Sequence, residues 1–176
     1  MTAGAGVGAA DSPGGRVASV APDADPDEHV RFARYRRAFA EVAPEGAVGL
    51  VRRVLADPDP AMAGSAVCEY LDRRAAELLA GPGFPSWYRE MAAAVATDGF
   101  AVRRLGDWAL LRTVELDEPW EAGQLLGASS RLQLRAAETS SARSALAVLA
   151  EGGRTRRIRN IAADRLRQLR NPPQLR

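Results

Sequence analysis

The part of the chain that can fold begins with apolar residues at helical spacing. Phe32, Tyr35, Phe39 and Val42 follow one another at intervals of three, four and three residues, which places them on one face of a helix. Similar stripes continue almost to the C-terminal end of the sequence. No six-residue stretch shows the β-branched or aromatic alternation that is typical of strands. The pattern predicts an all-α fold over residues 26–171.

Proline and glycine clusters divide this region into an N-terminal helix and about four helix pairs. The first pair is a short helix at residues 45–56, followed by a long helix that ends at Gly81. The second pair opens with Ser86 as the predicted N-cap, turns at residues 97–99 and ends near Leu116.

The other two pairs are predicted in the same way. The third starts at Pro119 and turns near Gly127. The fourth runs over residues 141–150, turns at residues 152–153 and continues until Pro172.

The two ends of the sequence differ from this pattern. Residues 1–25 are rich in Gly, Ala, Pro and Asp, and Val7, Val17 and Val20 are their only larger apolar side chains. Burial of so little apolar surface cannot offset the entropy lost on ordering the segment. We therefore expect a disordered N-terminal tail over residues 1–25 and a flexible C-terminus over residues 172–176.

A short helix, an Asp or Gly turn and a longer helix with Arg and small residues form an order that resembles HEAT repeats. In the fourth pair, the residues that match this order are Leu146, Leu149, Gly152, Arg159, Ala162, Ala163 and Leu166. In the first pair, the matching residues are Val51, Val54, Leu55, Asp57, Ala66 and Leu71, but the usual Arg is missing.

This resemblance covers about residues 45–170 and implies a short α-solenoid, in which successive repeats bury a continuous core. A compact irregular bundle of eight or nine helices is the alternative, because each of its helices would show the same apolar stripe.

Charge is distributed unevenly along the chain. All 24 basic residues are Arg, in a composition that is typical of a high-GC bacterial genome. Residues 1–30 hold five acidic residues and one Arg, whereas residues 131–176 hold eleven Arg and three acidic residues. The chain is thus predicted to have an acidic head and a basic tail.

Basic clusters recur in the second helix of every predicted pair. The HEAT resemblance implies that these helices line a concave binding surface. The candidate binding residues are Arg73, Arg74, Arg103, Arg104, Arg131, Arg135, Arg156, Arg157 and Arg159. The alternative is a solvated face on which each Arg pairs with a nearby acid, such as Asp72, Asp107, Glu138 or Asp164.

Catalytic and metal-binding chemistry has little support in the sequence. The chain has one His, His29, and one Cys, Cys68, so a Cys/His zinc site or a disulfide framework is excluded. We expect Cys68 and Trp108 to be core residues, and we expect no catalytic residue, metal or cofactor. A DNA glycosylase-like HEAT enzyme, with Asp107 and Trp108 as its Asp–Trp pair, is a remote alternative.

These observations favour a non-enzymatic adaptor that binds a protein with an acidic surface. A nucleic-acid-binding module that uses the Arg clusters and the basic C-terminal helix is the alternative. No apolar run approaches the roughly 20 residues that span a bilayer, and the first residues do not resemble a secretory signal. We therefore expect a cytoplasmic protein without membrane partners.

Overall fold

The computed structural model describes residues 27–170 and confirms the all-α prediction. No β-strand occurs in this range. The predicted tail at residues 1–25 and the predicted C-terminus at residues 172–176 lie outside the described residues. The described helices are α1 (Glu28–Glu41), α2 (Pro44–Leu55), α3 (Pro60–Leu78), α4 (Phe84–Ala94), α5 (Gly99–Glu115), α6 (Ala122–Gly127), α7 (Ser130–Thr139), α8 (Arg143–Gly152) and α9 (Arg156–Arg170).

Local side-chain caps explain where several of these helices begin. Asp27 accepts a hydrogen bond from the backbone N–H of His29 at 2.8 Å, and Asp98 accepts one from Ala101 at 2.7 Å. Asp59 caps α3 in the same way, directly before Pro60. Such caps satisfy backbone donors that have no partner within the helix.

Two predicted helix starts are wrong. Helix α4 begins at Phe84, with Gly83 as its N-cap, and Ser86 lies inside the first turn, where its hydroxyl donates to the Gly83 carbonyl at 3.2 Å. Pro85 fits this first turn because its missing N–H is not needed there. Helix α6 begins at Ala122, three residues after Pro119.

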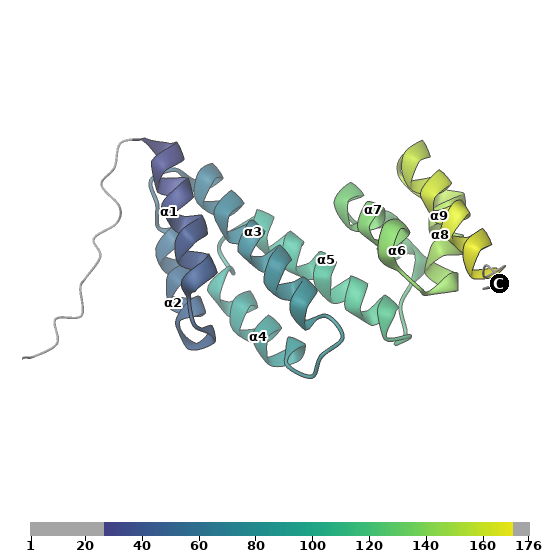
Figure 1. Cartoon of the computed structure of the whole chain (residues 1–176), viewed down its shortest axis with the longest axis horizontal. Coiled ribbons are helices and arrows are strands. Elements are labelled where there is room, and N and C mark those ends of the chain that lie inside the picture. The colour runs from purple at the N-terminus through teal and green to yellow at the C-terminus, as the bar shows by residue number, and fades with distance from the viewer. Residues whose placement is uncertain (1–26, 171–176) are drawn as a thin grey trace, which may run out of the picture.

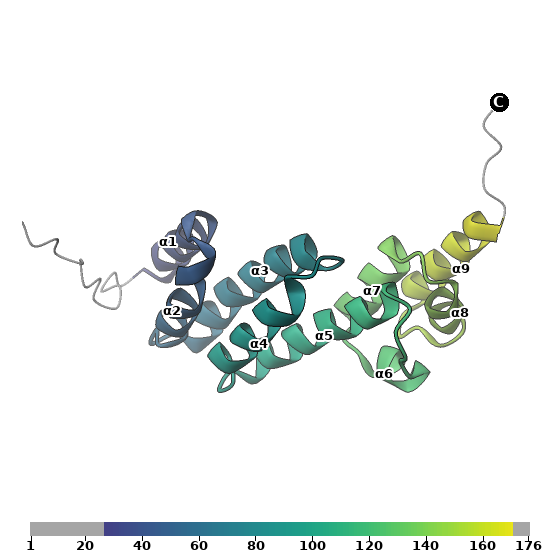
Figure 2. The ribbon, with the colours of Figure 1, turned by 90° about the horizontal axis from the view of Figure 1, so that it is seen from below.

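The helices stack in two layers along an elongated molecule. One layer is formed by α1, α3, α5, α7 and α9, in which each helix packs against the next, and α2 with α4 and α6 with α8 pack in the other layer. Figures 1 and 2 show α1 and α2 at one end of the long axis and α8 and α9 at the other. The helices thus follow one another in chain order along the stack.

One continuous apolar core runs through the layers. Its fully buried side chains come from successive helices and include Leu71, Met91, Leu105, Leu111, Leu125, Leu146 and Leu149. Trp108 and Cys68 are also buried, as predicted, whereas Leu166 is only partly buried. Leu166 lies on α9, the last described helix of the stack, where no further described helix covers it.

The stack has one weak joint. Helices α4 and α6 make at most marginal contact, although they are neighbours in the same layer. The described parts before and after this joint are connected mainly by packing of α5 against α7. The site described below lies at this joint.

Candidate functional site

Asp72 on α3 is the centre of a polar cluster that joins three helices. Its carboxylate accepts hydrogen bonds from Arg104 of α5 at 2.7 Å, from Arg131 of α7 at 2.5 Å and from the indole N–H of Trp108 at 2.8 Å. The Asp72 and Arg104 side chains are only 15% and 14% exposed, whereas Arg131 is 64% exposed. Arg104 is therefore fixed by the fold, and Arg131 remains accessible to a ligand.

Trp108 is held in this cluster on two sides. Its N–H is bonded to Asp72, and the guanidinium of Arg135 lies over its ring at 4.6 Å. A cation over an indole face is an attractive contact. Asp107, the neighbour of Trp108, instead accepts a hydrogen bond from the hydroxyl of Ser129. Asp107 and Trp108 thus make separate contacts, which their adjacency in the sequence does not reveal.

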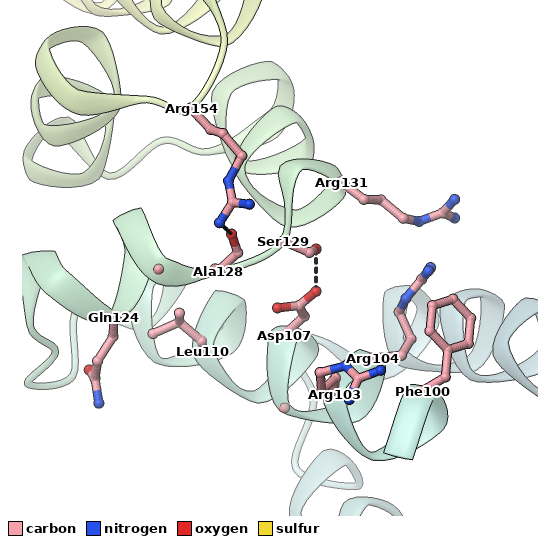
Figure 3. A pocket seen from close by; sticks show the side chains of 12 residues that line it. Phe100, Arg103, Arg104, Asp107, Leu110, Gln124, Ala128, Ser129, Arg131 and Arg154 are labelled. Carbon is pink, nitrogen blue, oxygen red and sulfur yellow. Dashed lines mark hydrogen bonds between the residues drawn. The ribbon is translucent and has the colours of Figure 1, made fainter. Parts of the chain in front are cut away.

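A groove of about 620 Å³ adjoins this cluster, between α5, the α6–α7 turn and the α8–α9 turn (Figure 3). We call it the arginine groove. Its charged and aromatic lining residues are Phe100, Arg103, Arg104, Asp107, Arg131 and Arg154. Four guanidinium groups and one carboxylate give the lining a positive balance. Phe100 is 49% exposed and adds an apolar surface to it.

Gln133 on α7 fixes one wall of the arginine groove. The side chain is fully buried, and its amide nitrogen donates to the carbonyls of Leu126 at 2.8 Å and Leu125 at 3.1 Å. Its oxygen accepts from the backbone N–H of Arg154 at 2.8 Å. Arg154 in turn donates to the Ala128 carbonyl at 3.2 Å. The turn that carries Arg154 is therefore anchored to the α6–α7 turn.

The predicted binding arginines divide between the groove and other places. Arg103, Arg104 and Arg131 line the groove, and Arg135 lies beside it over Trp108. On α3, Arg73 donates to the Phe39 carbonyl at 2.7 Å, while Arg74 pairs with Glu77 at 2.8 Å.

The predicted α9 arginines contact their own surroundings. Arg159 donates to the Gly153 carbonyl at 2.7 Å, and Arg157 lies 3.6 Å from Glu138. Arg156 is exposed. These contacts do not bring the nine candidate arginines into one cluster. Several of them pair with an acidic side chain, as expected of a solvated surface.

Asp57 and Asp59 both act structurally. Asp57 is buried and accepts from Arg31 at 3.1 Å, from the Tyr35 hydroxyl at 2.7 Å and from the Asp59 backbone N–H at 2.8 Å. Burial by itself raises the pKa of the Asp57 carboxyl, but these hydrogen bonds outweigh it and hold the pKa below its ordinary value. The carboxylate is thus kept ionised and ties α1 to the start of α3.

His29 and Cys68 lie in opposite environments, since His29 is exposed and Cys68 is buried. The His29 side chain is 88% exposed, and its nearest acidic partner is Glu28 at 4.0 Å. Burial raises the pKa of the Cys68 thiol to about 11. Since the thiolate is the nucleophilic form, Cys68 is poorly suited to nucleophilic chemistry at neutral pH.

Residues 27–170 contain neither a metal-binding cluster nor a membrane-spanning helix. No group of three or more His, Cys, Asp or Glu side chains there could hold a metal ion. No helix in this part of the chain has the length and apolar character that would let it cross a bilayer.

The sequence did not single out Gln133 and Arg154, and it offered Asp72 only as a possible surface partner. A polar residue within an apolar stripe was the available signal for Gln133, which follows Leu132 at the start of α7. The partners of Asp72 are up to 59 positions away, so helical periodicity gave no signal for them.

No protein-family model, no curated protein sequence and no solved structure matches this chain.

Proposed function

We propose that this protein is a cytoplasmic, HEAT-like adaptor that binds an acidic surface of another protein without catalysing a reaction. The observation that carries the proposal is the arginine groove, whose lining combines Arg103, Arg131 and Arg154 with an exposed Phe100. Arginine and aromatic side chains concentrate binding energy at protein interfaces. A rigid helical stack is a suitable support for such residues.

The carboxylates near these arginines favour a protein over a nucleic-acid ligand. Asp107 lines the groove itself, and Asp72 lies directly behind Arg104 and Arg131. A continuous phosphate backbone is best met by unbroken positive charge. A protein surface, in contrast, offers acidic groups, neutral donors and apolar side chains together, and the groove has a counterpart for each of them.

A nucleic-acid-binding function has one observation of its own in its favour. Helix α9 contains six arginines and a single acidic residue, Asp164. Arg157 and Arg167 are 72% and 71% exposed, although they lie near Glu138 and Asp164 respectively. A helix of this kind can follow phosphates in a manner that depends strongly on salt.

Partner capture with two matched variants tests the adaptor proposal. The bait is the full chain, coupled through a photocrosslinker and exposed to nuclease-treated extract of the native cell. The first variant combines Arg103→Gln, Arg131→Gln and Arg154→Gln, which all line the arginine groove. The control combines Arg36→Gln and Arg37→Gln on α1, whose exposed side chains pair with Glu69 and Glu41.

We expect the wild type and the control to capture the same protein, and the triple groove variant to lose it. Retention by the triple variant contradicts the proposal. Tight binding to a generic duplex, with affinity that falls steeply as salt rises, would instead favour the nucleic-acid function.

A further inference from the structure

The arginine groove has cationic side chains at both ends and a carboxylate between them. We infer that the arginine groove binds an extended segment of the partner chain, in which two acidic side chains are separated by neutral residues. This inference rests on the adaptor function proposed above.

The first end is formed by Arg131 and Arg104. Arg131 uses one terminal nitrogen on Asp72 and is 64% exposed, so its other N–H groups remain accessible. Figure 3 shows the guanidinium groups of Arg104 and Arg131 close to each other, with the Phe100 ring beside them. A ligand carboxylate can accept from Arg131 here while a neighbouring apolar side chain covers Phe100.

The second end is formed by Arg154. Its side chain reaches over the α6–α7 turn and donates to the Ala128 carbonyl through one nitrogen. Gln133 holds the backbone N–H of Arg154, and the Ala128 carbonyl holds its guanidinium. Figure 3 shows it on the opposite side of the groove from Arg103 and Phe100. This position suits a second carboxylate of the same ligand.

Asp107 determines what lies between the two acids. Its Oδ2 accepts the Ser129 hydroxyl, and the carboxylate lies in the middle of the groove (Figure 3). A third acidic side chain there would meet like charge, whereas a ligand backbone N–H or a hydroxyl can donate to Asp107. The groove thus favours an acidic, neutral, acidic order.

Arg103 adds positive charge without being occupied elsewhere. It lines the groove and is exposed, and within residues 27–170 it has no hydrogen-bond or ion-pair partner. The volume of about 620 Å³ accommodates a few residues of an extended chain. A short linear segment therefore fits the groove better than a folded domain, which would contact only its rim.

Synthetic peptides test this inference with the full-length protein. The probes are Trp-containing peptides in which two Glu residues are separated by one, two or three Ser or Gly residues. Each is compared with the same peptide carrying Gln in place of both Glu. Binding is followed by backbone amide NMR up to about 5 mM peptide, because isolated segments bind weakly.

We expect at least one spacing to bind, with shifts at Phe100, Asp107 and Ser129, and its Gln counterpart to bind at least about tenfold more weakly. Arg131→Gln and Arg154→Gln should each weaken binding about tenfold, while Arg167→Gln on α9 should leave it unchanged. A peptide with a third, central Glu should bind Asp107→Asn more tightly than the wild type.

The inference is overturned if no acidic peptide exceeds its Gln counterpart, or if Arg131→Gln and Arg154→Gln leave the affinity unchanged. It is also overturned if an oligothymidylate binds the groove more tightly than every peptide. These outcomes are separable from failure of the adaptor function. If the groove variants bind no peptide but still capture the protein, the peptide preference of the groove holds and the adaptor proposal, which rests on the groove, is contradicted.

Discussion

The side-chain oxygen of Gln133 accepts the backbone N–H of Arg154 at 2.8 Å, across 21 positions of sequence. Because the same side chain also donates to the end of α6, one buried amide joins α6, α7 and the α8–α9 turn. The backbone from which the Arg154 side chain enters the groove is thus held by the core.

Gln133→Leu removes these hydrogen bonds without a large change in volume. We expect a loss of about 2–4 kcal/mol in the free energy of unfolding, because buried carbonyl and N–H groups are left without partners. Urea unfolding measures it. Gln168→Leu, at an exposed position of α9, should change stability by less than about 0.5 kcal/mol. Equal urea midpoints for the two variants would refute the anchoring role.

Arg104→Gln tests whether the cluster around Asp72 is structural. It leaves a largely buried carboxylate with fewer donors, so we expect a cost of about 1–3 kcal/mol in thermal or urea unfolding. Arg74→Gln is the matched control, since Arg74 pairs with Glu77 at the surface of the same α3 helix. It should cost no more than about 1 kcal/mol. If both variants cost the same, Arg104 is an ordinary surface residue.

The lowered pKa of Asp57 predicts that the protein loses stability at acidic pH. Because the pKa of its carboxyl is lowered in the folded state, its contribution to stability is complete above the unfolded-state pKa. That contribution is lost as pH falls through the folded pKa. We expect wild type to be more stable than Asp57→Asn at pH 7, and the difference in melting temperature to shrink below about pH 4. A difference that stays constant down to pH 2 would contradict this.

Replacement of glycine by alanine should have opposite effects on stability at two positions, Gly153 and Gly49. A methyl group on Gly153 would lie 2.5 Å from the Leu149 carbonyl oxygen and 2.8 Å from Ile158, whereas nothing lies within 4 Å of one on Gly49. Gly153→Ala should therefore destabilise the protein. Gly49→Ala, inside α2, should stabilise it by about 0.5–1 kcal/mol. Calorimetric melting of both variants gives the signs, and equal signs would contradict the prediction.

Leucine truncation should show where the core ends. Leu71 is completely buried in α3, and Leu71→Ala should cost about 2–5 kcal/mol. Leu166 is only partly buried, so Leu166→Ala should cost roughly half as much. Denaturant unfolding of the two variants compares them directly. An equal cost would mean that Leu166 is covered by something beyond the described helices.

Helical periodicity was sufficient to predict the fold class and most of the helices. The intervals between Phe32, Tyr35 and Phe39 depend only on neighbouring turns of one helix, so a local pattern contains them. Helix starts were predicted less well, as at Ser86, because several residues near a proline can serve as an N-cap.

The site depended on relations that a local pattern does not contain. Arg131 was a candidate because it is basic, but its contact with Asp72 spans 59 positions and exists only because α3, α5 and α7 lie side by side. Arg73 was equally basic, yet its guanidinium turns to the carbonyl of Phe39. The residue type was readable from the sequence, and the direction of the side chain required the packing.

The weak joint between α4 and α6 has a consequence for how such a chain can diversify. The contacts of Arg131 with Asp72 and of Arg135 with Trp108 both come from one face of α7, a helix of 10 residues. Substitutions of Arg131 or Arg135 can therefore change how α7 packs against α3 and α5 without replacing any side chain of the continuous apolar core. Mutations on this face of α7 can thus change the shape of the groove separately from the stability of the fold.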